Sequence, residues 1–501
     1  MGSDYKAVVE SVRRAFNSGK TREKSWRIEQ LEALNRLLIE NEILLCDALY
    51  RDLHKSRMES MGSELDFVKN DIIGALRDLD EWMLPKPARK TVPTLLDSLM
   101  VVPEPYGVVL VIGAWNYPIN LTLAPLVGAI SAGNTAILKP SEISPHTARA
   151  IEQLIPKYLD SECIKVIYGG IPETTSLLKQ RFDYVFYTGS TAVGKIVRQS
   201  TNQFLTPCTL ELGGKSPVYV DSTVDIKTTA KRLLWGKIVN VGQTCIAPDY
   251  LLCSKDVEKQ LIAEFKPLLA KWFPKGLKAS PDYGRIVTKN HFERLNKLVK
   301  SSSGKLALGG EQDAAELFMG ISVLTDVSPK DTIMQEEIFG PILPIVNVNS
   351  AQEAVDFINE REKPLSLYLY SNDKKVQELF ISRTSSGGLT INECLLQLSI
   401  ESLPFGGVGN SGMGAYHGTA SFETFSHNKS VLIRDLGWLS ETLGSVRYPP
   451  YTSRNETVMK MLLKNRKLPS FGVLGYVGSF ALGALATTWG MVSSFKDMWG
   501  A

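Results

Sequence analysis

The sequence predicts an α/β protein with a doubly wound parallel sheet, a second α/β domain and a C-terminal transmembrane helix. Three observations support this prediction. A chain of 501 residues is too long for one ordinary hydrophobic core, so more than one domain is expected. From residue 107 onward, short apolar runs alternate with longer amphipathic runs. Close to the C-terminus, a long stretch contains no charged residue.

The first α/β domain follows a helical N-terminal region. Leucines recur at helical spacing within residues 26–84, and prolines between 85 and 105 then predict an extended connection or an edge hairpin. Apolar strands that alternate with helices are typical of a parallel sheet covered on both faces, and ligands bind such sheets beyond the carboxyl ends of the strands. The expected strands are GVVLVIG (107–113), TAILKP (135–140), CIKVIYGG (163–170) and FDYVFYTG (182–189), each followed by a helical run.

A second α/β segment is expected from about residue 211 to 404. Its clearer strands are PILPIVNV (341–348), PLSLYLYS (364–371) and GGLTINEC (387–394). Residues 468–495 then carry no charge, and this length exceeds the roughly 20 residues that a membrane helix needs. The segment also contains five glycines, so a buried C-terminal helix is the alternative. The basic residues that precede it predict a cytosolic flank and are Arg454, Lys460, Lys464, Arg466 and Lys467.

Composition argues against several classes of function. A net charge of +3 and the absence of a Lys/Arg block interleaved with aromatic residues give no indication of nucleic-acid binding. The six cysteines form no CxxC pair, so neither a metal site nor a disulfide framework is expected, and a reduced intracellular compartment fits best.

Two glycine motifs suggest nucleotide binding but depart from the known patterns. GSTAVGKI (189–196) has Ile196 where a P-loop needs the Ser or Thr that binds magnesium. GVGNSG (407–412) matches G-x-G-x-x-G, but it does not follow a strand. The GSTAVG turn lies between a strand and a helix, where backbone amides and the helix dipole can hold a phosphate without metal. A purely structural turn is the alternative.

Polar residues in apolar or tight surroundings are the candidates for chemistry. Glu211 stands between two leucines in a strand, where burial would raise its pKa towards that of a general base, although an ion pair is the alternative. Cys245 lies in the small polar loop VNVGQTCIAP (239–248), which we expect to leave the sulfur accessible and near backbone donors. Buried structural cysteines are nevertheless common. Asn116 in GAWNYP and the carboxylates of QEEIFGP (335–341) have turn chemistry as their alternative.

Together these segments resemble the aldehyde dehydrogenase superfamily, and more closely its class 3 branch, which includes fatty aldehyde dehydrogenases. The resemblance covers approximately residues 5–445, and we found no departure that would disable catalysis. The matching motifs, in the order of the family, are GAWNYP, LKPSE, FYTGST, LELGGKSP, GQTCIAPDY, EEIFGP and PFGGVGNSGMGAYHG.

The resemblance implies a role for each motif. Cys245 would attack the aldehyde, Asn116 and the Cys245 amide would hold the oxyanion, and Glu211 would activate the water that releases the acid. Lys139 and Glu142 would lie near the adenosine ribose, and Glu337 with Phe339 would position the nicotinamide ribose. Glu142 favours NAD, although NADP is possible. The turn that replaces the usual dinucleotide fingerprint consists of Gly189, Ser190, Thr191, Ala192, Val193 and Gly194.

The resemblance also implies a domain organisation. Residues 1–84 and 107–210 would form the NAD-binding domain and residues 211–404 the catalytic domain. Residues 85–106 and 425–448 would form an oligomerisation segment, which implies a homodimer.

The charge-free segment adds a hypothesis about the substrate. Long-chain aldehydes partition into bilayers, so the sequence suggests a membrane-anchored fatty aldehyde dehydrogenase that faces the cytosol, on the endoplasmic reticulum or another organelle surface. The alternatives are a membrane-anchored NTPase built on GSTAVGK and a catalytically idle scaffold.

Overall fold

The computed structural model describes residues 5–464, which form two compact units. Of the described residues, the first unit contains 5–84 and 103–427, and the second contains 85–102 and 428–464. The predicted membrane helix at 468–495 lies outside the described residues. Within residues 5–464, no helix is both long enough and apolar enough to cross a membrane.

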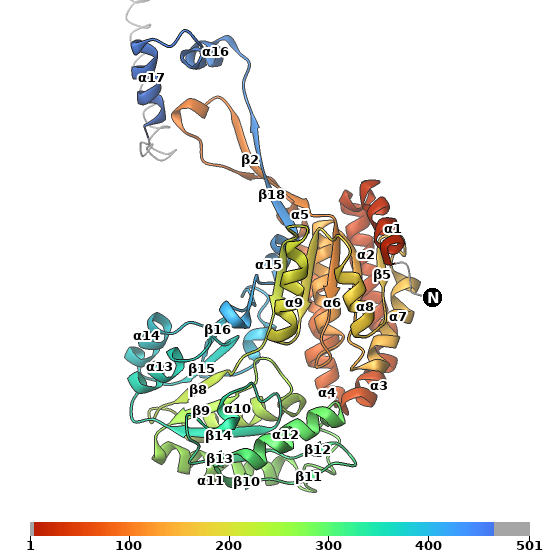
Figure 1. Cartoon of the computed structure of the whole chain (residues 1–501), viewed down its shortest axis with the longest axis vertical. Helices are drawn as coiled ribbons and strands as arrows, with labels where there is room; N and C mark the ends of the chain where they lie inside the picture. Colours follow the sequence, from red (N-terminus) through yellow and green to blue (C-terminus); the bar gives the residue numbers. More distant parts are fainter. Residues whose placement is uncertain (1–4, 465–501) are drawn as a thin grey trace, which may run out of the picture. The chain divides into compact units, whose positions relative to one another are not determined.

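The first unit contains a six-stranded sheet (Figure 1). Its order is β17-β7-β6-β3-β4-β5, and all neighbours are parallel except β17 and β7. The four strands predicted between residues 107 and 189 are confirmed as β3 to β6. The strands are β3 (Val108–Ile112), β4 (Thr135–Lys139), β5 (Ile164–Val166), β6 (Tyr184–Thr188), β7 (Cys208–Glu211) and β17 (Gly412–Met413).

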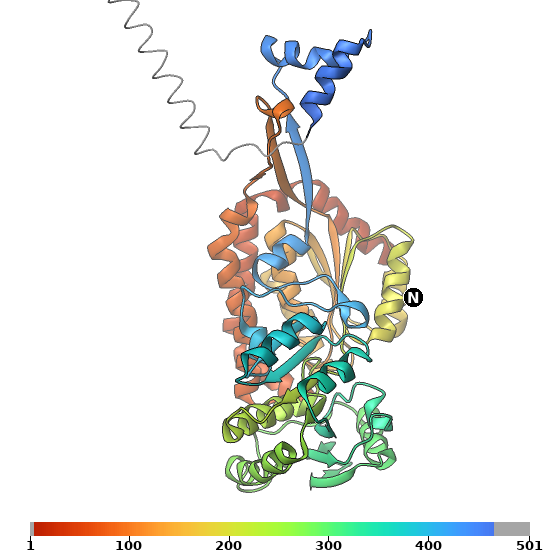
Figure 2. The same ribbon diagram turned by 90° about the vertical axis from the view of Figure 1, so that its left-hand side faces the viewer.

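Helices cover both faces of this sheet, so its doubly wound character is confirmed. Along β3, Val109 and Val111 pack into a core with α2, α5, α6 and α7, whereas Val108 and Leu110 pack into another core with α1, α8 and α9. Figure 2 shows this layering, with orange-red helices on one side of the sheet and a yellow helix on the other. The crossover helices are α6 (Asn120–Ala132), α7 (Pro145–Tyr158), α8 (Ile171–Leu178) and α9 (Thr191–Asn202).

The N-terminal region is helical, as predicted. A short π-helical turn, Met61–Leu65, interrupts the helical path between α4 and α5, and such turns are frequent at functional sites. The helices are α1 (Tyr5–Asn17), α2 (Lys24–Glu40), α3 (Glu42–Leu53), α4 (Arg57–Ser60) and α5 (Asp66–Met83).

A second, seven-stranded sheet follows directly after Glu211, because β7 ends there and β8 begins at Pro217. Its order is β10-β13-β14-β9-β8-β15-β16, and only the edge strand β10 is antiparallel to its neighbour. Its strands are β8 (Pro217–Val220), β9 (Tyr250–Cys253), β10 (Lys305–Gly309), β13 (Ser322–Thr325), β14 (Ile342–Asn347), β15 (Ser366–Tyr370) and β16 (Gly388–Ile391).

The helices around this sheet share one large hydrophobic core with it. They are α10 (Ile226–Ile238), α11 (Lys255–Trp272), α12 (Lys289–Ser301), α13 (Ala351–Asn359) and α14 (Lys374–Arg383). A two-stranded ribbon of β11 (Gln312–Asp313) and β12 (Phe318–Met319) and the helix α15 (Gly418–Thr424) complete the unit. Both sheets belong to one compact unit, so the predicted boundary between a cofactor-binding and a catalytic domain stays a prediction.

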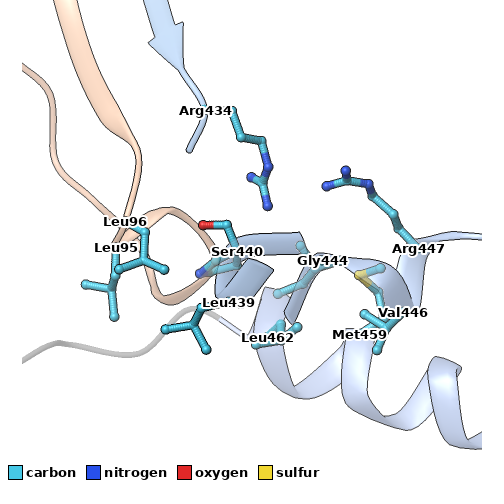
Figure 3. Close-up of a pocket in the computed structure, with 12 residues that line it drawn as sticks. Leu95, Leu96, Arg434, Leu439, Ser440, Gly444, Val446, Arg447, Met459 and Leu462 are labelled. Atoms are coloured by element: carbon cyan, nitrogen blue, oxygen red, sulfur yellow. The ribbon is translucent and has the colours of Figure 1, made fainter. Parts of the chain in front are cut away.

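The described part of the second unit contains most of a three-stranded sheet and the helices α16 and α17. Its sheet has the order β1-β2-β18, and its strands are β1 (Lys86–Pro87), β2 (Ser98–Pro105) and β18 (Ser426–Ile433). Helices α16 (Trp438–Gly444) and α17 (Ser453–Leu463) border a cavity of about 350 Å³. Figure 3 shows Leu95, Leu96 and Leu439 on one side of this cavity and Val446 and Met459 on the other.

The cations of this cavity already have partners, since Arg434 pairs with Asp97 and Arg447 lies 3.7 Å from Glu441. The unit overlaps the segments predicted for oligomerisation, 85–106 and 425–448, and their role in assembly stays a prediction.

Candidate active site

Glu211 is the last residue of β7 and lies between the sheet neighbours Thr188 and Gly412. Only 3% of the residue is exposed, and neither carboxyl oxygen has a hydrogen-bond partner. Burial without a partner raises the pKa of Glu211 well above its ordinary value. The predicted burial is therefore confirmed, and the alternative of a structural ion pair is wrong.

Cys245 lies just after a strained 3-10 turn, Val239–Gly242. Asn240 and Val241 adopt left-handed φ values of 49° and 55° there, an unfavourable conformation for a β-branched valine. We expected an accessible loop, but Gln243 and Thr244 are buried and Cys245 is only partly exposed. The reason is that the Gln243 side chain is fully hydrogen-bonded inside the unit: it donates to the carbonyls of Asn240 and Arg285 and accepts from the Val287 N–H.

Burial raises the pKa of the Cys245 thiol, and the nearby carboxyl groups of Glu337 and Glu211 raise it further. The backbone N–H groups of Cys245 and Ile246 oppose this effect because they favour the thiolate. The sulfur is thus close to backbone donors, as expected, but in this arrangement they do not outweigh burial.

Asn116 lies in the loop after β3, and only 3% of the residue is exposed. Its Nδ2 donates to the carbonyl of Gln243 at 3.1 Å, and the next residue, Tyr117, shares a 2.7 Å hydrogen bond with Thr244. The structure therefore brings the predicted Asn116 and Cys245 segments together, although 127 positions separate Asn116 from Gln243.

Glu337 also belongs to this cluster. Its carboxyl group packs against Gly213, where an added Cβ would lie 2.1 Å from Oε2, so any larger residue there would displace the carboxyl group. One carboxyl oxygen is buried without a partner. Burial, followed by the charge of Asp249, raises the pKa of Glu337 to about 8. Phe339, at a φ of 54°, places its ring edge-on to Trp115 with 5.3 Å between centroids.

Lys215 and Asp249, which our sequence reasoning missed, hold the Glu337 segment in place. Lys215 Nζ lies 2.6 Å from Asp249 and donates to the carbonyls of Ile333 and Glu336, each at 2.9 Å. Asp249 in turn accepts the N–H of Ile338 at 3.1 Å. Their signal was available, because both are charged residues inside the motifs LELGGKSP and GQTCIAPDY.

The GSTAVG turn lies at the carboxyl end of β6, as predicted. Ser190 caps α9 by accepting the Val193 N–H at 3.4 Å, and the Gly189 N–H donates to the carbonyl of Glu211 at 3.0 Å. Ala192 and Val193 are exposed, whereas Gly194 packs against Leu212 so closely that a Cβ would lie 2.6 Å from it. The first turn of α9 is therefore open to an anion.

Lys139 and Glu142 lie two strands away, at the end of β4. Lys139 Nζ pairs with Glu142 at 2.7 Å and donates to the carbonyl of Pro140 at 3.0 Å. Strands β6, β3 and β4 are parallel neighbours, so the residues that follow them lie at the same carboxyl-terminal end of the sheet. These residues are the α9 turn, Asn116, and the pair of Lys139 and Glu142.

GVGNSG does not open a helix of a βαβ unit. Gly409–Ser411 forms a single 3-10 turn that leads into β17, and the carbonyl of Asn410 accepts the Thr191 hydroxyl at 3.1 Å. Within the described part of the chain, no group of three or more His, Cys, Asp or Glu residues is arranged to hold a metal ion.

Comparison with known proteins gives consistent matches. The model of the aldehyde dehydrogenase family matches residues 2–431. The chain is 48% identical to aldehyde dehydrogenase family 3 member A2 of Mus musculus, with 95% of this chain and 97% of that protein covered. It is 50% identical to the dimeric NADP-preferring aldehyde dehydrogenase of Rattus norvegicus, with coverage of 89% and 98%.

A solved structure of the substrate-bound state of Staphylococcus aureus AldH superposes with a TM-score of 0.87 at 42% identity. The superposition covers 91% of this chain and 99% of that chain.

Proposed function

This chain belongs to the aldehyde dehydrogenase family and oxidises aldehydes with a nicotinamide dinucleotide, and we propose that Cys245, Asn116 and Glu211 carry out the chemistry. One observation supports this proposal above all others. Four segments far apart in sequence converge, because Asn116 bonds to Gln243 and the charges of Glu211 and Glu337 act on the Cys245 thiol.

Each residue has a definite task in this scheme. The Cys245 sulfur adds to the aldehyde carbon, and the carbonyl oxygen becomes an alkoxide. Asn116 uses one Nδ2 hydrogen to hold Gln243, which leaves the second hydrogen, together with the Cys245 N–H, for the alkoxide. After oxidation, a thioester joins the acyl group to Cys245. In its ionised form Glu211 takes a proton from the water that hydrolyses this thioester, and its raised pKa makes that form a stronger base than an ordinary carboxylate.

The residues present fit a nicotinamide dinucleotide. The open turn of α9 offers backbone donors to the diphosphate, and Gly213 allows close approach beside Glu337, whose buried oxygen lacks a partner. Glu337 and Phe339 would hold the nicotinamide end, and Lys139 and Glu142 the adenosine ribose. When bound, the cofactor supplies the hydride acceptor for the oxidation.

We favour NAD over NADP. The Glu142 carboxylate stands beside Lys139 at 2.7 Å and neutralises the cation that could otherwise pair with a 2′-phosphate. The rat relative is named NADP-preferring, so the preference of this chain depends on the local balance between these two side chains.

The surroundings of Cys245 suit an aldehyde with an apolar tail. Val239, Ile246, Leu365 and Leu395 form a buried cluster against which Cys245 packs. The residues that follow Leu395 include three exposed apolar side chains, Leu396, Ile400 and Leu403. Apolar contacts of this kind stabilise a hydrocarbon chain by roughly 0.8 kcal/mol per buried methylene. Medium- to long-chain fatty aldehydes are therefore the proposed substrates.

The second unit supports a homodimer. Strand β18 lies at the edge of its sheet and exposes Leu432 and Ile433, and an unprotected apolar edge favours pairing with another chain. The rat relative is named as dimeric. The charge-free segment 468–495 and its basic flank support a membrane anchor with the catalytic unit in the cytosol, at the endoplasmic reticulum or another organelle surface.

The two alternatives have less support. An NTPase built on GSTAVGK would lack its magnesium ligand, because Ile196 is an exposed apolar residue on α9. An idle scaffold would not need an unpartnered buried Glu211 beside Cys245, since this arrangement costs stability.

Steady-state kinetics over saturated aldehydes of 2 to about 16 carbons, with NAD and with NADP, test the proposal. We expect kcat/KM to rise about three- to fourfold per methylene until the apolar path is filled. A maximum at the shortest aldehydes would refute the fatty-aldehyde assignment. Cys245→Ser should abolish oxidation, and retained activity in that variant would refute the nucleophile. Removal of 468–501 should move the protein from the membrane to the soluble fraction.

A further inference from the structure

We propose that the buried Lys55–Glu64 ion pair is a positioning device that fixes the oxyanion donor Asn116 against the loop of Cys245. This inference rests on the proposed role of Asn116. Neither residue touches the reacting atoms in the scheme above, and their segment, HKSRMESMGSE (54–64), showed no motif in the sequence.

Lys55 lies just after the end of α3, and Glu64 lies in the π-helical turn before α5. Lys55 Nζ is 2.6 Å from Glu64 Oε1, and both side chains are 0% exposed. The same ammonium group donates to the main-chain carbonyl of Asn116 at 2.9 Å and lies 4.0 Å from the centroid of the Tyr117 ring. A buried cation thus contacts the oxyanion-donor loop at two consecutive residues.

Glu64 holds the other end of this loop. Its second oxygen accepts the N–H groups of Ile119 and Asn120, each at 3.0 Å, at the start of α6. Burial raises the pKa of Glu64, whereas Lys55 and the two N–H groups lower it. The pair therefore clamps residues 116–120 from both ends, with the ammonium on a carbonyl and the carboxyl group on two amides.

The clamp reaches the nucleophile loop through shared acceptors. Asn240 Nδ2 donates to the Asn116 carbonyl at 2.9 Å and to the Gln243 carbonyl at 3.0 Å, and Gln243 also accepts the Asn116 side chain. The Asn116 carbonyl is therefore fixed by Lys55 on one side and by Asn240 on the other. Loss of Lys55 would free the peptide plane that determines where the Asn116 side-chain amide points.

Stability alone does not require such a pair. The desolvation of two buried charges offsets much of their attraction, and apolar residues of similar volume often give equal or greater stability. An apolar replacement therefore separates the two roles. If the pair is only structural, Lys55→Met/Glu64→Leu is active; if it positions Asn116, the double variant folds but reacts slowly.

The rates of two reactions of Cys245 distinguish a positioning role from a merely structural one. Acylation by p-nitrophenyl acetate creates an oxyanion before nitrophenolate leaves, so it depends on Asn116 but needs no cofactor. Alkylation by iodoacetamide displaces iodide without forming an oxyanion, so it reports only on the accessibility and charge of the thiol. We expect Lys55→Met and the double variant to slow acylation roughly 100-fold. Alkylation should change less than about threefold.

Asn116→Ala is the benchmark, and Lys55→Met should slow acylation little further in that background because both act through one group. If Asn116→Ala leaves acylation unchanged, the proposed oxyanion role fails. If Asn116→Ala slows acylation but Lys55→Met and the double variant do not, the positioning role fails.

Glu258→Gln is the matched control. Glu258 is also a buried, ion-paired carboxylate, 2.8 Å from Lys255, but it lies on α11 outside the cluster. This variant should lower stability without slowing acylation. If Lys55→Met does not fold, the double variant decides the question. If alkylation falls as much as acylation in the double variant, the pair has only a general structural role and the inference is wrong.

Discussion

Replacement of Glu211 by Gln should make the protein more stable and almost inactive. The Glu211 carboxyl group is buried without a partner, and its pKa is well above the ordinary value of about 4.3. Between these two pKa values the folded protein keeps a proton that the unfolded chain releases. The free energy of unfolding therefore falls with rising pH, by up to about 1.4 kcal/mol per pH unit from this group alone. Glutamine cannot ionise, so this loss is absent in the variant.

The stability difference has a defined pH dependence. Below about pH 4 both residues are neutral in both states, so the two proteins should unfold at nearly the same denaturant concentration. Towards pH 7 the variant should become the more stable protein. Denaturant unfolding at several pH values measures this difference. An equal pH dependence of the two proteins would refute the burial of an unpaired Glu211.

The kinetic effect should appear after the first turnover. Asn116 and Cys245 are intact in Glu211→Gln, so one equivalent of reduced cofactor should form rapidly per active site. Hydrolysis of the thioester then lacks its base, and steady-state turnover should fall by about 10²- to 10⁴-fold. Stopped-flow absorbance of the reduced nicotinamide records both phases. Normal turnover, or the absence of both burst and turnover, would contradict the assigned role.

Asp71→Asn is the control for this experiment. Burial raises the pKa of Asp71 to about 7, so its removal should change the pH dependence of stability in the same direction. Asp71 lies on α5 and contributes nothing to the proposed chemistry. Its replacement should leave the burst and the steady-state rate unchanged. A stalled Asp71→Asn enzyme would show that the loss of any buried carboxyl group disturbs the site.

Two further predictions concern neighbouring charges. Glu337→Gln removes the largest charge effect on Cys245 and should lower the thiol pKa, so alkylation of the cofactor-free enzyme by iodoacetamide should become roughly three- to tenfold faster. The gain should appear only above about pH 8, where Glu337 is ionised, and a gain confined to lower pH would contradict it. Glu142→Ala frees the Lys139 ammonium and should raise the ratio of kcat/KM for NADP to kcat/KM for NAD about tenfold, which corresponds to about 1.4 kcal/mol. An unchanged ratio would show that Glu142 does not contact the adenosine ribose.

The sequence allowed prediction of those features that depend on local pattern. The runs that became β3, β4, β6 and β15 are apolar on both faces, so their burial required no tertiary information. The burial of Glu211 followed from Leu210 and Leu212 for the same reason. The position of Asn116 in the loop just beyond β3 also followed, since strand ends are marked by the loss of the apolar run.

Features that depend on long-range contacts could not be predicted. Lys55 and Glu64 lie in a polar stretch without a motif, and their partners Asn116, Ile119 and Asn120 are distant in sequence. The closed form of the Cys245 loop depends on Gln243, whose bonding partners include Arg285 and Val287 from a distant segment. A local sequence window around Cys245 contains Gln243 but neither Arg285 nor Val287.

The buried acids of this unit separate into two kinds, and partnering rather than burial distinguishes them. Glu64 is fully buried but is satisfied by an ammonium group and two backbone amides, so its position is fixed. Burial raises the pKa of all three acids, but only Glu211, with both carboxyl oxygens, and Glu337, with one, have buried oxygens without a partner. Because these two carboxyl groups and the Cys245 thiol influence each other, their protons dissociate as a coupled set. An apparent pKa in the pH–rate profile therefore belongs to the cluster, and replacement of either glutamate should shift it.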